Sequence, residues 1–288
     1  MRIAGMVLGI TVVTISIAVT KHRTKTETST AVFSGFGSWQ IANNALYAYP
    51  HTEIDNAIIP PQCHELDSIV KKYFNSLPAE QKLIDTPDTR YMWDSTSPLW
   101  TFSKYYAVKN SISNDFNSWN AVAPVFSTYG YAIIMRHPWT FMKYYLWPSA
   151  RQYFLPLAGE LSYYNERKTT VDTGAIKWFG YKTARVHAIS DKVQVAILGP
   201  APYLYLTFHI LFWGSFIILL VKRKKVFADT NFKKTALLFA CFLAANACFS
   251  IFATPALLRY QLLPFILYMA FTTLFLDRLI GIKPGKAS

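Results

Sequence analysis

Four long apolar runs alternate with polar stretches along the chain. They cover residues 3–20, 200–221, 235–252 and 257–276. A run of roughly 18–22 residues, rising about 1.5 Å per residue as a helix, spans the hydrocarbon core of a bilayer. Because backbone polar groups inside lipid must be paired within their own segment, each run is predicted to be a membrane-spanning helix.

The first run allows two interpretations. A single Arg2 precedes it, and Ser16-Ile17-Ala18 would be an acceptable cleavage site for a signal peptide. The run is longer than the apolar core of a signal peptide, which has about 7–15 residues. Its length favours a retained helix over a cleaved signal, and under either interpretation the region that follows is exported.

A basic loop between the second and third runs sets the predicted orientation. Residues 222–234 contain six Lys or Arg residues and one acid, Asp229. A short loop of this kind belongs on the cytoplasmic side. We therefore expect a multi-pass protein of the cell inner membrane, with residues 21–197 in the periplasm. The basic cluster Lys21, Arg23 and Lys25 runs against the charge rule, which long translocated domains largely escape.

The predicted fold is an α-helical membrane protein with four transmembrane helices and a mostly α-helical extracytoplasmic domain between the first and second. Its domains are a transmembrane helix or signal anchor over residues 1–20, an aromatic-rich extracytoplasmic domain over 21–197, and a three-helix membrane domain over 198–288.

Apolar spacing predicts several helices within residues 21–197. From Leu66 to Leu77 apolar residues recur every three or four positions, between Pro60-Pro61 and Pro78. The remaining expectations are a helix over 39–49, another over 99–109, one or two helices over 114–135 with interruptions near Pro124 and Gly130, and short strands at 169–171 and 184–186.

The aromatic segment from Pro138 to Trp147 is predicted to be a short helix that Pro148 ends. It is too short to cross a bilayer, and Lys143 is its only charged residue. Two placements remain open with equal weight. The helix lies along the outer leaflet, as amphipathic interfacial helices do, or it is buried in the core of the outer domain.

Composition excludes some classes of function. Hydrophobic residues make up 52% of the chain and charged residues 16%, and the net charge is +13. Much of the excess positive charge flanks the apolar runs, and no nucleic-acid-binding module is visible, so no nucleic-acid partner is expected. The three cysteines form neither a disulfide framework nor a metal-binding pattern. No resident metal or other cofactor is expected, although a divalent cation stays open without a motif to support it.

Candidate site residues are few. Arg259 lies near the outer end of the last apolar run, where an arginine either anchors the helix at the interface or pairs with a lipid phosphate. Glu53 and Asp55 lie in a polar loop, and Asp94 follows the aromatic segment 91–93. Acids beside aromatic rings occur in carbohydrate sites, but isolated loop acids are more often solvated.

Three stretches resemble a known family. Two of them, Gly37 to Tyr47 and the segments between Tyr129 and Pro156, are similar to multi-pass glycosyltransferases of Bacteroidetes-type bacteria, and the third is Leu258 to Pro264. The last stretch resembles the Arg-Tyr ending of the broader GT-C superfamily, which includes the dolichyl-phosphate-mannose-protein mannosyltransferases.

The resemblance implies transfer of a sugar from a polyprenyl-phosphate carrier, with membrane lipid as a further partner. Arg259 and Tyr260 match the family ending and would contact the carrier phosphate. Such enzymes have more membrane helices and an essential acid in their first outer loop. The chain is therefore expected to be the C-terminal part of such an enzyme, with an N-terminal companion half and an unidentified catalytic residue. The alternative is a non-enzymatic membrane-anchored protein whose outer domain binds a protein or glycan.

Overall fold

A computed structural model describes residues 2–54, 57, 59–82, 84, 86–159, 165, 168–187, 190–222, 230–253 and 256–280. The described residues are mostly helical, as predicted, and contain no named strand. They divide into two compact units, Met1–Pro148 and Ser149–Ser288. This division separates parts of the chain that pack within themselves. The predicted boundaries at residues 20 and 197 instead mark where the chain is expected to enter or leave the membrane.

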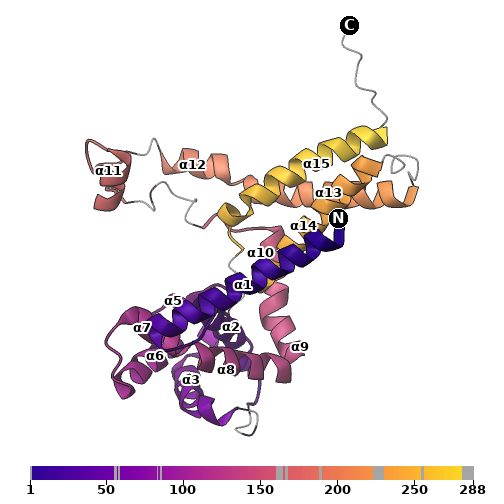
Figure 1. Cartoon of the computed structure of the whole chain (residues 1–288). Helices are drawn as coiled ribbons and strands as arrows, with labels where there is room; N and C mark the ends of the chain where they lie inside the picture. Colours follow the sequence, from indigo (N-terminus) through magenta and orange to yellow (C-terminus); the bar gives the residue numbers. More distant parts are fainter. Residues whose placement is uncertain are drawn as a thin grey trace. The chain divides into compact units, whose positions relative to one another are not determined.

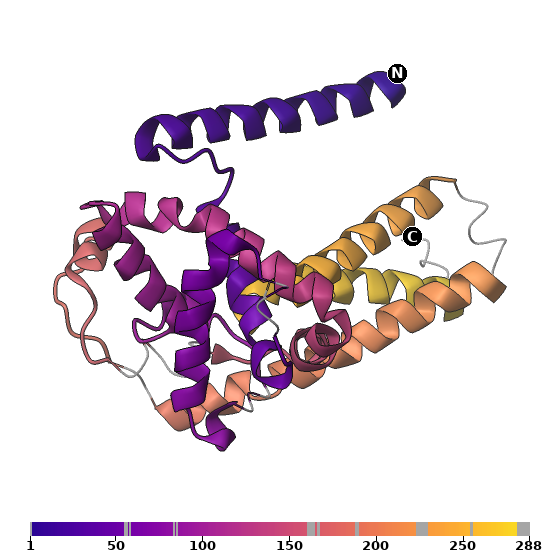
Figure 2. The same cartoon turned by 90° about the horizontal axis from the view of Figure 1, so that it is seen from below.

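Unit 1 consists of one long N-terminal helix and a bundle of shorter ones (Figure 1). Its elements are α1 (Arg2–Thr28), α2 (Gly35–Leu46), η1 (Tyr49–His51), η3 (Pro61–Cys63), α3 (His64–Ser76), α4 (Ala79–Lys82), α5 (Arg90–Trp93), α6 (Pro98–Lys109), α7 (Asp115–Ala121), α8 (Ala123–Arg136), α9 (Pro138–Phe141) and the π-helical turn η4 (Met142–Leu146). Figure 2 shows α1 as one uninterrupted helix.

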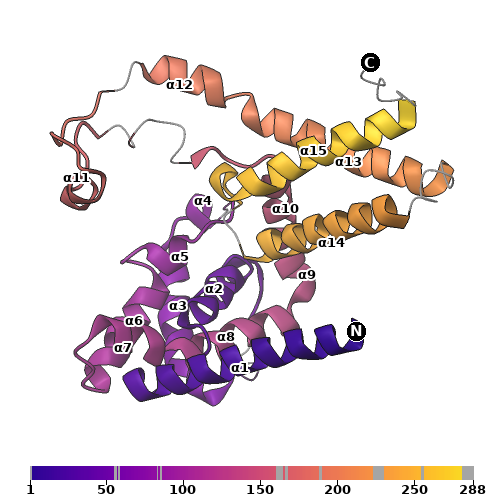
Figure 3. The ribbon, with the colours of Figure 1, turned by 45° about the horizontal axis from the view of Figure 1, so that its top comes forward.

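Unit 2 contains three long apolar helices. Its elements are α10 (Trp147–Phe154, which begins in unit 1), α11 (Thr173–Phe179), α12 (Asp191–Leu198), α13 (Ala201–Lys222), α14 (Thr230–Phe252), η8 (Leu258–Gln261) and α15 (Leu262–Ile280). Helix α15 packs against both α13 and α14 (Figure 3). A core of aromatic and aliphatic side chains, including Phe212, Leu243 and Tyr268, joins the three.

Four helices in the described part of the chain are long and apolar enough to cross a membrane: Ala4–Thr28, Val195–Val221, Thr230–Phe252 and Leu258–Ile280. They coincide with the four predicted runs, of which the first and the last begin one residue earlier than the helix. The first is longer than predicted, because the helix continues through Lys21, Arg23 and Lys25 to Thr28. Residues 223–229 of the basic loop, and the tail after Ile280, lie outside the described residues.

The centre of unit 1 is a closely packed pair formed by α2 and α8. Trp39, Phe126 and Tyr129 are fully buried there. Gly130 lies at the crossing, and a Cβ atom on it would be 2.6 Å from Cγ2 of Ile41 and 2.8 Å from the Ile41 carbonyl. The absence of a side chain at residue 130 therefore lets the two backbones approach.

Most predicted helices of unit 1 are confirmed, with two corrections. The helices over 66–77 and 99–109 correspond to α3 and α6. Gly130 does not interrupt a helix but lies inside α8. Pro148 does not end the aromatic helix either, because the helical segment continues from η4 through Pro148 to the end of α10.

The two predicted short strands pair with one another in unit 2. Thr170 and Arg185 form an isolated antiparallel bridge. The backbone N–H of Val171 donates to the carbonyl of Ala184 at 2.9 Å, and that of Val186 donates to the carbonyl of Thr169 at 2.9 Å. The pairing is too short to count as a strand.

Candidate functional site: a tryptophan groove in unit 1

A groove of about 640 Å³ runs between α6 and α7. Helix α6 contributes residues at spacings of three and four, which places them on one helix face. The chain turns back after α6 and presents the start of α7 to that face. The lining residues are Trp93, Trp100, Ser103, Lys104, Ala107, Val108, Ile112, Ser113, Asp115, Phe116, Ser118 and Trp119.

Local capping fixes the two helices that form the groove. The Ser97 hydroxyl accepts from the backbone N–H of Trp100 at 3.2 Å and starts α6. The Asn114 side chain accepts from the N–H of Phe116 at 2.8 Å and starts α7. Such caps pair backbone donors that the first helical turn leaves open. They position Trp100 and Asp115, each within the first turn after its cap.

Stacked indoles form one end of the groove. The Trp39 ring stacks on Trp119 with centroids 4.0 Å apart and planes 9° apart. Trp119 in turn stacks on Trp93 at 5.6 Å and 23°. Trp39 is fully buried, Trp119 is half-buried and Trp93 is exposed. The buried ring thus supports an aromatic platform that continues to the surface.

Some of the indole N–H groups near this platform donate hydrogen bonds within the described part of the chain, and others do not. That of Trp39 donates to the carbonyl of Trp119 at 3.0 Å, and that of Trp100 donates to the carbonyl of Met92 at 2.7 Å. Among the described residues, no acceptor pairs with the indole N–H of Trp93 or Trp119. Trp93 can therefore offer a ring face and a hydrogen-bond donor to a ligand, while Trp119, which stacks with both Trp39 and Trp93, can offer its N–H group.

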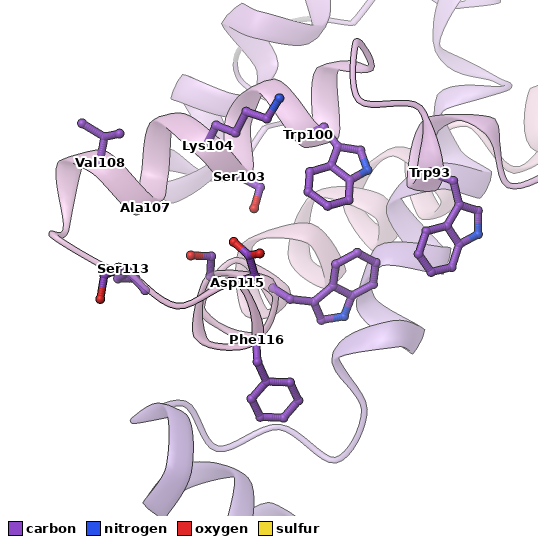
Figure 4. A pocket seen from close by; sticks show the side chains of 12 residues that line it. Trp93, Trp100, Ser103, Lys104, Ala107, Val108, Ser113, Asp115 and Phe116 are labelled. Atoms are coloured by element: carbon purple, nitrogen blue, oxygen red, sulfur yellow. The ribbon is translucent and has the colours of Figure 1, made fainter. Parts of the chain in front are cut away.

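Polar side chains lie beside the aromatic end. Figure 4 shows Ser103 and Asp115 pointing into the space between the two helices, with Trp93 and Trp100 at one end and Val108 and Ser113 at the other. Lys104 and Asp115 are both exposed. The groove thus combines ring faces, hydroxyl groups, one carboxylate and one ammonium group.

The predicted acidic candidates lie elsewhere in unit 1. Glu53 is exposed in the loop after η1. Asp94 caps the end of α5, where it accepts from the backbone N–H and the hydroxyl of Thr96 at 2.8 and 2.7 Å. These hydrogen bonds, with a smaller contribution from Arg90, hold the pKa of Asp94 below its usual value. Among the described residues no hydrogen bond or salt bridge joins Glu53 to Asp94. Asp55 lies outside the described residues.

Arg259 and Tyr260 lie together in η8, before α15 begins at Leu262. The sequence predicts that Arg259 belongs to the last membrane-spanning helix, whereas the structure places it in the 3-10 turn that leads into α15. Its guanidinium carbon lies 4.7 Å from the Tyr260 ring centroid, and Nη2 donates to the Tyr260 hydroxyl at 2.7 Å. Arg259 is half-buried and Tyr260 is exposed.

A second polar cluster, which the sequence did not indicate, lies inside unit 2. The Gln261 side-chain oxygen accepts from Tyr205 at 3.1 Å and from Asn246 at 3.2 Å. Beside it His209 is 1% exposed, and neither ring nitrogen has a hydrogen-bond partner in the described part of unit 2. The hydrogen bonds join α13, α14 and η8, so the cluster holds the apolar helices together.

Only some of the residues that line the groove could be identified from the sequence. In the sequence, Trp93 is an aromatic residue next to the acid Asp94. In the structure Trp93 lines the groove, whereas Asp94 caps the end of α5. Asp115, Lys104 and Trp119 gave no motif, because they meet only when α7 folds back on α6. No group of three or more His, Cys, Asp or Glu residues suited to a metal ion occurs within the described ranges.

Comparisons of the chain with family models, with curated proteins and with solved structures gave no match.

Proposed function

We propose that the chain is a membrane-embedded protein that binds a carbohydrate in the tryptophan groove of unit 1, on the side of the membrane opposite to the basic loop 222–234. The observation that carries the proposal is the exposed indole of Trp93, supported by its stacking on Trp119, beside Asp115 and Ser103. Sugar rings have apolar C–H faces that pack on indoles, and their hydroxyl groups donate to carboxylates and accept from indole N–H groups.

The size and chemistry of the groove favour this ligand class over others. A volume of about 640 Å³ is within the range of about 300–1,000 Å³ for small-molecule sites. One carboxylate and one ammonium group leave the groove without a strong excess of either charge, which suits a neutral ligand. A nucleic acid would require a basic groove.

Glycan binding is tested with the full chain in lipid nanodiscs on an array of immobilised oligosaccharides. Trp93→Ala removes an exposed stacking surface and should weaken binding roughly tenfold, which corresponds to about 1.4 kcal/mol. Asp115→Asn should also weaken binding. Trp178→Ala is the matched control, because Trp178 is 87% exposed on α11, outside the groove.

Two results would overturn the proposal. One is that the wild-type chain binds no oligosaccharide on the array. The other is that Trp93→Ala and Trp178→Ala bind equally well.

A second function, participation in GT-C-like sugar transfer from a polyprenyl-phosphate carrier, is favoured by the position of Arg259. The helices α13, α14 and α15 follow one another through the membrane, so η8 lies at the end of α14 opposite to Thr230. On the proposed orientation this is the outer end. A guanidinium group held there against Tyr260 suits a lipid-linked phosphate.

Arg259→Ala should reduce retention of a polyprenyl phosphate by the nanodisc-embedded protein, measured by native mass spectrometry, because the phosphate loses its paired donors. Arg259→Lys should restore only part of it, since lysine keeps the charge but not the fork. Arg278→Ala serves as the control, because Arg278 lies over Phe232 at the other end of the bundle. Unchanged retention in Arg259→Ala would remove the proposed role of Arg259.

A further inference from the structure

The helical segment from α9 through η4 into α10 has one buried face and one exposed apolar face. Phe141 and Tyr145 are 3% and 0% exposed and belong to the core of unit 1. Trp139, Met142 and Trp147 are 77%, 46% and 64% exposed. A helix whose outer face meets water normally carries polar residues there, so this pattern is the reverse of the usual one.

The π-helical turn η4 explains why the two tryptophans share a face. In a continuous α-helix, residues eight positions apart point about 80° away from each other. A π turn closes its hydrogen bonds one residue later than an α turn and takes up the extra rotation. The turn over Met142–Leu146 lies between Trp139 and Trp147, and both side chains emerge on the exposed face.

The charged residues along this segment of the chain have one sign. Between residues 131 and 154 the chain contains Arg136, Lys143 and Arg151 and no Asp or Glu. Arg136 and Lys143 are exposed, and the Lys143 ammonium group lies 4.9 Å from the Tyr144 ring centroid. The Tyr144 ring stacks on His51 with centroids 3.5 Å apart and planes 7° apart, which fixes the Tyr144 ring against η1.

A bilayer is the surface that these features fit. Tryptophan favours the boundary between hydrocarbon and headgroups, and Lys and Arg side chains extend from there to lipid phosphates. The same chain has four helices able to span a membrane, so a bilayer adjoins it. A second copy of the chain would have to present acidic residues to the basic rim, and this face, which carries none, cannot pair with itself by charge.

We propose that the face formed by Trp139, Met142, Lys143 and Trp147 lies in the headgroup layer of the bilayer and contacts anionic lipid. Its two tryptophans reach the top of the acyl chains, while Arg136 and Lys143 pair with lipid phosphates. This contact holds unit 1 at the membrane independently of any ligand in the groove.

The test uses the full chain labelled with 5-fluorotryptophan in nanodiscs of phosphatidylcholine and phosphatidylglycerol. Each fluorine resonance is assigned by a single Trp→Phe variant, and a nitroxide-labelled lipid is then added. The Trp139 and Trp147 resonances should lose most of their intensity, as should that of Trp213 in α13. The Trp93 resonance from the groove and the Trp39 resonance from the core should keep most of theirs.

A second comparison tests the charge component. Nanodiscs of phosphatidylcholine alone should leave more of the Trp139 and Trp147 signals than nanodiscs with phosphatidylglycerol do. The proposal is overturned if these two signals are broadened no more than that of Trp93. It is also overturned if they resist both the lipid label and a water-soluble gadolinium complex, because a protein partner would then cover the face.

Discussion

Asp67 is the acid around which the polar interior of unit 1 is organised. Its side chain is 4% exposed. One carboxylate oxygen accepts from the hydroxyls of Tyr49 at 2.9 Å and Tyr129 at 2.8 Å, and the other pairs with Lys71 at 2.9 Å. A buried carboxylate is tolerated when its oxygens are paired in this way. The arrangement joins α3 to α8 and to η1.

Burial and the Asp67 charge make unit 1 sensitive to alkaline conditions. Burial, followed by the nearby Asp67 carboxylate, raises the pKa of Tyr49, and burial likewise raises the pKa of Tyr129. A tyrosine in the unfolded chain has a pKa of about 10. The folded state thus keeps protons that the unfolded state releases above that pH. The stabilisation is complete below about pH 10 and is lost progressively as the pH rises above it.

We therefore expect the thermal midpoint of unit 1, followed by near-ultraviolet circular dichroism of its aromatic cluster, to fall as the pH rises above about 10. Tyr129→Phe should lower the midpoint at pH 8, because Asp67 loses one hydrogen bond, a net cost of about 1.5–3 kcal/mol for a charged acceptor. The same variant should show a smaller further fall with rising pH. Equal pH dependence in wild type and Tyr129→Phe would contradict this account.

The sequence identified some candidate site residues and missed others, depending on whether their neighbours along the chain make them unusual. Arg259 is visible because a cation near the end of an apolar run is unusual. Asp115 and Trp119 stand in ordinary surroundings along the chain, and only their packing against α6 gives them a shared environment. Side chains that meet through tertiary folding leave no spacing pattern that periodicity can detect.

At the scale of elements, the crossing of α2 and α8 depends on Gly130. Gly130→Ala would place a Cβ within 2.6–2.8 Å of Ile41 atoms, two of which belong to the backbone. The helices must then move apart, at a cost of roughly 1–3 kcal/mol. For a domain of this size the thermal midpoint should fall by roughly 2–10 °C.

Gly37→Ala is the matched control, because it lies in the same helix pair and its added Cβ would have its nearest neighbours at 3.7 and 3.8 Å, in the Ser34 side chain. Alanine is the better helix former, so this variant should leave the midpoint unchanged or raise it slightly. If Gly130→Ala were as stable as Gly37→Ala, the close crossing would not be a requirement of the fold.

Elements were predictable where sequence pattern and packing agree. The helix α3 has apolar residues at helical spacing and prolines on both sides, so its bounds follow from the chain alone. The predictions that Pro148 ends a helix and that Gly130 interrupts one were wrong, for different reasons. The helical segment continues from η4 through Pro148 into α10. Gly130 fits inside α8 because the Ile41 backbone approaches it closely.

At the scale of the whole molecule, the proposed function requires the tryptophan groove and the basic loop to lie on opposite sides of the membrane. Four helices suited to crossing and the basic residues before Thr230 support this orientation. The proposed carbohydrate site and the proposed role of Arg259 both assume it.

Cysteine labelling in spheroplasts tests the orientation directly. Reporter cysteines are placed at two exposed positions, Ser113→Cys in the groove and Thr230→Cys at the start of α14, in a chain whose own three cysteines are replaced by alanine. A membrane-impermeant maleimide should label Ser113→Cys in intact spheroplasts and Thr230→Cys only after permeabilisation. Labelling of Thr230→Cys in intact spheroplasts, with Ser113→Cys protected until the membrane is opened, would contradict the account.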